Sequence, residues 1–87
     1  MNEWEKDEVL MNSCRRTIKR LSSDAKELFH LQEIDSRTQS LKDMVLFAKK
    51  VHGICANAMQ NTYGENKNAV RHLMIDAELF YENLEVS

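Results

Sequence analysis

Proline is absent from this 87-residue sequence, glycine occurs twice, and aromatic residues make up only 7% of the chain. A collagen-like chain needs abundant glycine and proline, so that class is excluded. Hydrophobic residues make up 43% of the chain, which is too many for a disordered protein. Two cysteines are too few for a disulfide scaffold. The composition is that of a globular domain.

Long apolar runs are also missing. A membrane helix needs roughly 20 predominantly apolar residues, whereas the longest uninterrupted apolar run here extends from Met44 to Ala48. Four of the first eight residues are acidic, unlike the basic start of a secretory signal. Cys14 and Cys55 lie within apolar helical patterns, which is typical of buried thiols in a reducing compartment. We therefore expect a soluble cytoplasmic protein that does not enter a membrane.

Chain length and net charge narrow the possible functions further. We treat residues 1–87 as a single domain, and a domain this short buries only about 60% of its unfolded surface. Oligomerisation is therefore a natural source of additional burial. The formal net charge is -2, whereas nucleic-acid-binding domains are usually strongly basic. Any binding of nucleic acid would have to involve a local cluster of basic residues.

The first third of the sequence repeats apolar residues every three or four positions, as one face of a helix does. The repeat predicts a helix over about 2–33, and Asp7 is the one residue that does not fit its apolar frame. Ser22-Ser23-Asp24 offers an alternative, because this segment could end one helix and cap the next, giving four helices. Since the frame keeps its phase across the segment, one long or bent helix is favoured. The two apolar columns are Trp4, Met11, Ile18 and Ala25, and Cys14, Leu21 and Leu28.

Two further apolar series predict helices over about 36–62 and 66–84. Ser36 and Gln39 form a capping-box pattern before the first of them, and Gly64 provides a stop after it. No alternating pattern typical of strands occurs. We therefore predict an all-α fold, an antiparallel helical hairpin or three-helix bundle, because short connections make neighbouring helices antiparallel.

Several large apolar residues fall outside these series. Leu46 and Phe47 lie beside the series of the second helix, and Ile75 lies beside that of the third. Trp4, the only tryptophan, lies at the free end of the long first helix. Because a short chain can bury few helices on all sides, we predict that these four residues contact another protein or a second copy of the chain. The plainer alternative is a four-helix bundle whose core absorbs them.

A cationic stripe in the first helix consists of Arg15, Arg16, Lys19 and Arg20. Four such charges can hold the phosphates of a nucleotide or nucleic acid, or face an acidic partner. No glycine-rich phosphate loop or aromatic stacking pattern accompanies them, so the specificity of this signal is low. A solvated face, paired with the acidic start of the same helix or with the acidic last helix, is the favoured interpretation.

Patterns for metal binding and catalysis are weak. Glu27 and His30 have the ExxH spacing of di-iron helical bundles, but the second such pair that those sites need is missing. No serine elbow, paired catalytic carboxylates or Walker pattern occurs. We therefore expect no metal, no cofactor and no enzymatic activity. The remaining histidines form half-sites at best, namely His52 with Cys55 and His72 with Asp76.

No motif singles out a family. The leading hypothesis is a non-catalytic interaction module that binds another protein and itself, as a homodimer or higher homo-oligomer. Inhibitor, immunity, anti-defence and adaptor roles are all compatible with it. The alternative is an oligomeric helical protein that binds a phosphate-bearing ligand, a nucleotide or nucleic acid, through the Arg15–Arg20 stripe.

Overall fold

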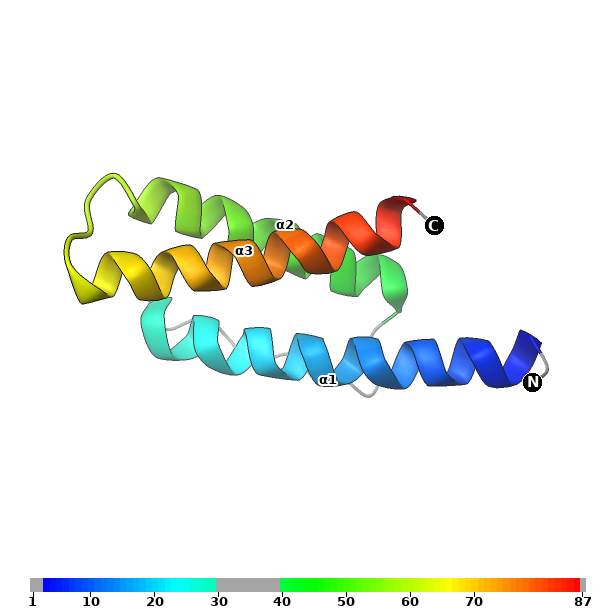
Figure 1. The fold of residues 1–87 in the computed structure, drawn as a ribbon. Helices are drawn as coiled ribbons and strands as arrows, with labels where there is room; N and C mark the ends of the chain where they lie inside the picture. Colours follow the sequence, from blue (N-terminus) through cyan, green and yellow to red (C-terminus); the bar gives the residue numbers. More distant parts are fainter. Residues whose placement is uncertain (1–2, 30–39, 87) are drawn as a thin grey trace.

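The computed structural model describes the backbone of residues 3–29 and 40–86 and the side chains of residues 8–29 and 40–84. Within these ranges the chain forms three helices and no strand: α1 (Glu3–Phe29), α2 (Leu41–Ala58) and α3 (Glu65–Val86). Each helix packs against the other two (Figure 1). The prediction of an all-α fold with three packed helices is confirmed.

α1 is one uninterrupted helix of 27 residues. It continues through Ser22, Ser23 and Asp24, so the alternative of a break at this segment is not found. Each of these residues costs only about half a kcal/mol in a helix interior. Leu21 and Ala25, which flank the segment, are fully buried, and their burial outweighs that cost. The predicted last turn of this helix, residues 30–33, lies outside the described residues.

α2 begins at Leu41 and ends at Ala58, so the predicted bounds of 36 and 62 are too wide at both ends. Its N-cap is Ser40, whose Oγ accepts a hydrogen bond of 3.2 Å from the backbone N–H of Asp43. The carboxylate of Asp43 also suits the positive end of the helix dipole. The predicted capping pair, Ser36 and Gln39, lies outside the described residues.

Gly64 has a φ of +68°, in the left-handed region that only glycine adopts without strain. It directly precedes Glu65, the first residue of α3. The glycine therefore allows the chain to turn from α2 into α3. α3 extends to Val86, slightly beyond the predicted end at 84.

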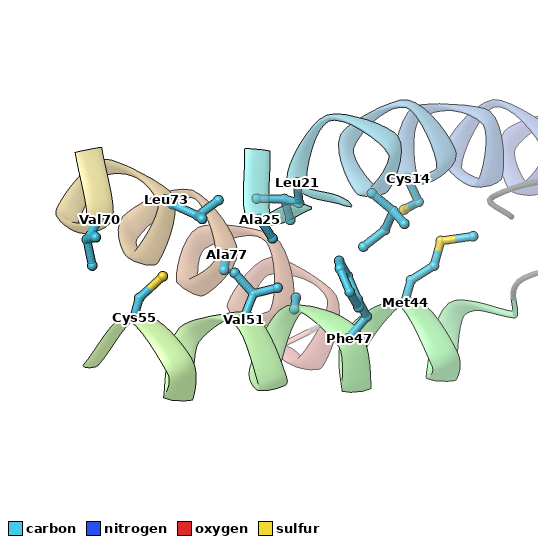
Figure 2. Packing of buried hydrophobic residues seen from close by; sticks show 12 residues of the cluster. Cys14, Leu21, Ala25, Met44, Phe47, Val51, Cys55, Val70, Leu73 and Ala77 are labelled. Atoms are coloured by element: carbon cyan, nitrogen blue, oxygen red, sulfur yellow. The ribbon is translucent and has the colours of Figure 1, made fainter. Parts of the chain in front are cut away.

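α1 and α2 run in the same direction, and α3 runs antiparallel to both (Figure 1). Figure 2 shows the same order in the core, where Cys14 of α1 lies toward Met44 of α2 and Ala25 lies further along, toward Val51. α2 and α3 form the antiparallel hairpin and pack most extensively. The predicted antiparallel arrangement does not extend to α1 and α2.

The core is built from one face of each helix (Figure 2). Ile18, Leu21, Met44 and Val51 are fully buried. Burying each such side chain stabilises the fold by about 1.5–3 kcal/mol. The buried cluster consists of Cys14, Ile18, Leu21, Ala25, Met44, Phe47, Ala48, Val51, Cys55, Val70, Leu73 and Ala77.

Candidate functional site

An open groove lies at the end of the bundle where α1 and α2 begin and α3 ends. We call it the end groove, and its volume is about 350 Å³. Apolar side chains from all three helices form its walls, and two exposed lysines, Lys42 and Lys49, stand among them. Its lining consists of Leu10, Leu41, Lys42, Val45, Leu46, Lys49 and Leu84.

A second groove, the side groove, lies between α1 and α3 and has a volume of about 370 Å³. It shares Leu10 and Leu84 with the end groove, so the two grooves adjoin. Leu79 and Phe80 of α3 add apolar surface, and the thiol-bearing residue Cys14 lies in its α1 wall. Its polar lining consists of Ser13, Thr17, Arg20, Asp76 and Asn83.

Three of the seven exposed large apolar side chains of the described residues, Leu10, Leu46 and Leu79, line these two grooves. Leu46 is 55% exposed and Leu79 is 54% exposed. Leu10, which belongs to both grooves, and its neighbour Val9 are exposed as well. Exposed apolar side chains that line grooves are candidates for contact with another molecule.

The predicted partner-contacting residues whose side chains are described, Leu46, Phe47 and Ile75, do not come together. Leu46 lines the end groove, whereas Ile75 is 41% exposed on α3 and lines neither groove. Phe47 is only 8% exposed and belongs to the core, which corrects its assignment to an exposed surface. α2 packs against both α1 and α3, so its buried stripe is wide enough to include Phe47. Trp4 lies in the first turns of α1, and its side chain is outside the described residues.

The residues that join the two grooves were not predicted from the sequence. Leu41 and Leu84 fit the three-and-four spacing of the apolar residues in their helices, and both are partly buried against the core. Leu10 fits neither apolar column of the first helix. The adjacent apolar residues Val9, Leu10 and Met11 form the one local signal that could have identified this end of α1.

The cationic stripe is divided between different faces of α1. At about 100° per residue, its four positions spread over about 140° of the helix surface. Arg20 turns toward α3, where its Nη1 lies 3.5 Å from Oδ2 of Asp76. Arg15 donates a hydrogen bond of 3.2 Å from Nη1 to Oδ1 of Asn12. Arg16 and Lys19 are exposed.

A polar cluster links α2 and α3 beside the end groove. The ring of His52 meets the ring of Tyr81 edge to face at a centroid distance of 5.8 Å, and its Nε2 lies 3.9 Å from Oε2 of Glu78. The Nζ atom of Lys49 lies 5.7 Å from the centroid of the Tyr81 ring. These contacts join α2 to α3 beside Lys49, which lines the end groove.

The two cysteines are poorly suited to nucleophilic chemistry. Burial raises the pKa of the Cys55 thiol to about 11, and burial also raises the pKa of Cys14. Reactive cysteines need a lowered pKa and access to solvent. His52 lies one turn from Cys55, yet that thiol is fully buried.

Metal-ligating side chains do not converge in the part of the chain that is described: no three or more His, Cys, Asp and Glu residues there are placed to hold an ion. A third groove, of about 250 Å³ between α1 and α3, does carry several of these residue types, including Asp24, Glu27 and His72. His30, the partner of Glu27 in the predicted ExxH pair, lies outside the described residues.

None of α1, α2 and α3 combines the length and the hydropathy that a membrane-crossing helix requires. Comparison with known protein families, characterised proteins and solved structures finds no match for this chain. The geometry of the grooves is therefore the basis for assigning a function.

Proposed function

We propose that this protein is a non-catalytic protein-binding module and that its contact surface is the end groove with the adjoining side groove. Leu10, Leu46 and Leu79 support this proposal because they are large, apolar and exposed, and because they gather around grooves that adjoin. Burying such a surface against a partner releases free energy of roughly 25 cal/mol per Å² of apolar area.

The partner that suits this surface is an apolar segment with acidic flanks. An amphipathic helix can insert apolar side chains spaced three or four residues apart between the leucines of the grooves. Its acidic residues would then face Lys42 and Lys49 in the end groove. Inhibitor, immunity, anti-defence and adaptor roles are all compatible with this mode of binding, because each requires only that a partner's surface be occupied.

Binding of a phosphate-bearing ligand through the Arg15–Arg20 stripe has weaker support. The guanidinium of Arg20 already faces the carboxylate of Asp76, with which a phosphate would compete. The four cations also point over too wide an arc of α1 to surround one phosphate. Protein binding is therefore the single function that we propose.

A pull-down experiment tests this function. The chain is immobilised, a host extract is passed over it, and mass spectrometry identifies the proteins that it retains. Leu46→Glu places a charge in the end groove, and Ile75→Glu places the same charge at a comparably exposed position outside both grooves. We expect wild type and Ile75→Glu to retain the same proteins and Leu46→Glu to lose them. Equal capture by all three chains would contradict the proposal, provided that circular dichroism shows the same helix content in each.

A further inference from the structure

We propose that the end groove binds an alkyl carboxylate, whose chain lies along the leucines and whose carboxylate faces Lys42 or Lys49. This inference goes beyond the proposed function, because it concerns a small ligand that the groove can hold without any protein partner. Three observations on described residues support this ligand: the chemistry of the lining side chains, the placement of the two lysines, and the volume of the groove.

The described side chains that line the end groove are of two kinds, aliphatic and cationic. Leucine and valine neither donate nor accept hydrogen bonds, and a lysine ammonium only donates. No described side chain of the lining can therefore accept a hydrogen bond from a sugar hydroxyl or a nucleobase amine. A carboxylate only accepts, and an alkyl chain needs no hydrogen bond at all. The aliphatic lining consists of Leu10, Leu41, Val45, Leu46 and Leu84.

Lys42 and Lys49 lie on the same face of α2. Seven residues separate them, so they are two turns, or about 10.5 Å, apart along the helix. Leu46 lies between them in the sequence and is 55% exposed. The Nζ atom of Lys49 lies 5.7 Å from the centroid of the Tyr81 ring, which is neutral and leaves the ammonium charge in place. Since no described residue of the lining is acidic, the groove matches an anion.

The volume of the end groove, about 350 Å³, suits a small ligand. Small-molecule sites have volumes of roughly 300–1,000 Å³ and often lie between the helices of a bundle. The adjoining side groove is of similar volume but lacks this combination of side chains. There Asp76 contributes a negative charge, and Ser13, Thr17 and Asn83 can accept hydrogen bonds. The end groove is therefore the one of the two that suits an alkyl carboxylate.

Titration of the isolated chain with decanoate, followed by amide chemical shifts in NMR spectra, tests this site. We expect saturable shifts at Leu41, Val45 and Leu46. Each methylene buried in full strengthens binding about fourfold, and one covered on a single side about twofold. Hexanoate, which is four methylenes shorter, should thus bind about 16-fold more weakly.

Decyltrimethylammonium tests the part played by charge, because it combines a ten-carbon chain with a positive head group. Attraction to the two lysines becomes repulsion, so its affinity should be at least about fourfold lower than that of decanoate. Absence of saturable shifts with decanoate would overturn the proposal. Equal affinity for the cation would also overturn it, since the groove would then bind any alkyl chain.

Two pairs of substitutions locate the carboxylate. Lys42→Gln with Lys49→Gln removes both charges of the groove and should weaken decanoate binding by about 2–30-fold. Lys50→Gln with Lys67→Gln removes the same net charge outside the lining and should leave the affinity unchanged. If both pairs bound decanoate equally well, with the helix content of wild type by circular dichroism, the proposal would be overturned.

Leu46→Glu tests the alkyl part of the site and should abolish the shifts, because its carboxylate repels decanoate and replaces apolar surface. Retention of wild-type affinity would overturn the proposal. The result is separable from that of the pull-down, since no protein partner is present in the titration. A chain that retains proteins through Leu46 but does not bind decanoate would overturn the ligand site and leave the protein-binding function standing.

Discussion

Replacement of Ile18 by alanine measures how firmly α1 is packed onto the other two helices. Ile18 is 0% exposed and lies in the middle of the buried face of α1. Its side chain is therefore one of those through which α1 is held in the core. Both grooves have a wall that α1 provides, so the candidate site depends on this packing.

The expected loss follows from the atoms removed. Ile18→Ala deletes three buried carbon atoms, worth about 2.4 kcal/mol at about 0.8 kcal/mol for each. The cavity that remains adds to this cost, so we expect a total of about 3–4 kcal/mol. Alanine is the best helix former, so helix propensity cannot account for a loss of this sign. A domain of this size is stable by about 4–13 kcal/mol, so the loss is a large fraction of the total.

Urea unfolding followed by far-ultraviolet circular dichroism measures the loss. Leu28→Ala is the matched control, because Leu28 lies on the same helix and is 36% exposed. We expect the control to lose less than about 1 kcal/mol, since substitutions of exposed residues have small effects. If Ile18→Ala cost no more than Leu28→Ala, α1 would not be packed through this face, and the walls of both grooves would be lost with it.

Three further predictions concern the capping, the direction and the ionisation of the chain. Ser40→Ala removes the hydrogen bond that caps α2 and should lower the free energy of unfolding by about 1 kcal/mol in the same urea assay, whereas no change would contradict the capping role. A nitroxide at Asn12 should broaden the amide signals of the start of α2 more than those near Ala58, about 27 Å further along, and the reverse result would show that α1 and α2 are antiparallel. The folded pKa of Cys55, about 11, lies above its ordinary value of 9.0, so the unfolded thiol ionises first as the pH rises. The free energy of unfolding should thus be unaffected by this thiol below pH 9 and fall by up to about 3 kcal/mol between pH 9 and 11; Cys55→Ala should make that fall smaller in pH-dependent urea unfolding, and an unchanged slope would contradict it.

Local periodicity was sufficient to predict the three helices and most of their buried faces. Ile18, Leu21 and Ala25 lie in the predicted columns and are fully buried, because residues three and four apart share one face of a helix whatever that helix packs against. Phe47 was missed because a narrow apolar column was assumed for α2. A helix that contacts two neighbours buries a wider stripe, and how many neighbours a helix has is not a local property.

The direction of α1 relative to α2 could not be predicted in the same way. Helices over 2–33 and 36–62 would leave a connection of two residues, which forces an antiparallel pair. α2 starts only at Leu41, after its N-cap Ser40, which leaves more chain between the two helices than the predicted start at 36 would leave, so an antiparallel pair is no longer forced. The position of the α2 N-cap, Ser40, therefore decided whether α1 and α2 had to be antiparallel or could also be parallel.

The amino-acid order alone was enough to define an all-α chain, its apolar faces and its cationic stripe, because spacing along a helix is set within a few residues. Packing in three dimensions decided that Leu10, Leu46 and Leu84 share one groove and that Arg20 turns to Asp76. These residues lie on different helices and far apart in the chain, and only the packing directions of α1, α2 and α3 bring them together. The candidate site is thus a product of the tertiary structure, although no residue in it has a local sequence pattern that sets it apart within its own helix.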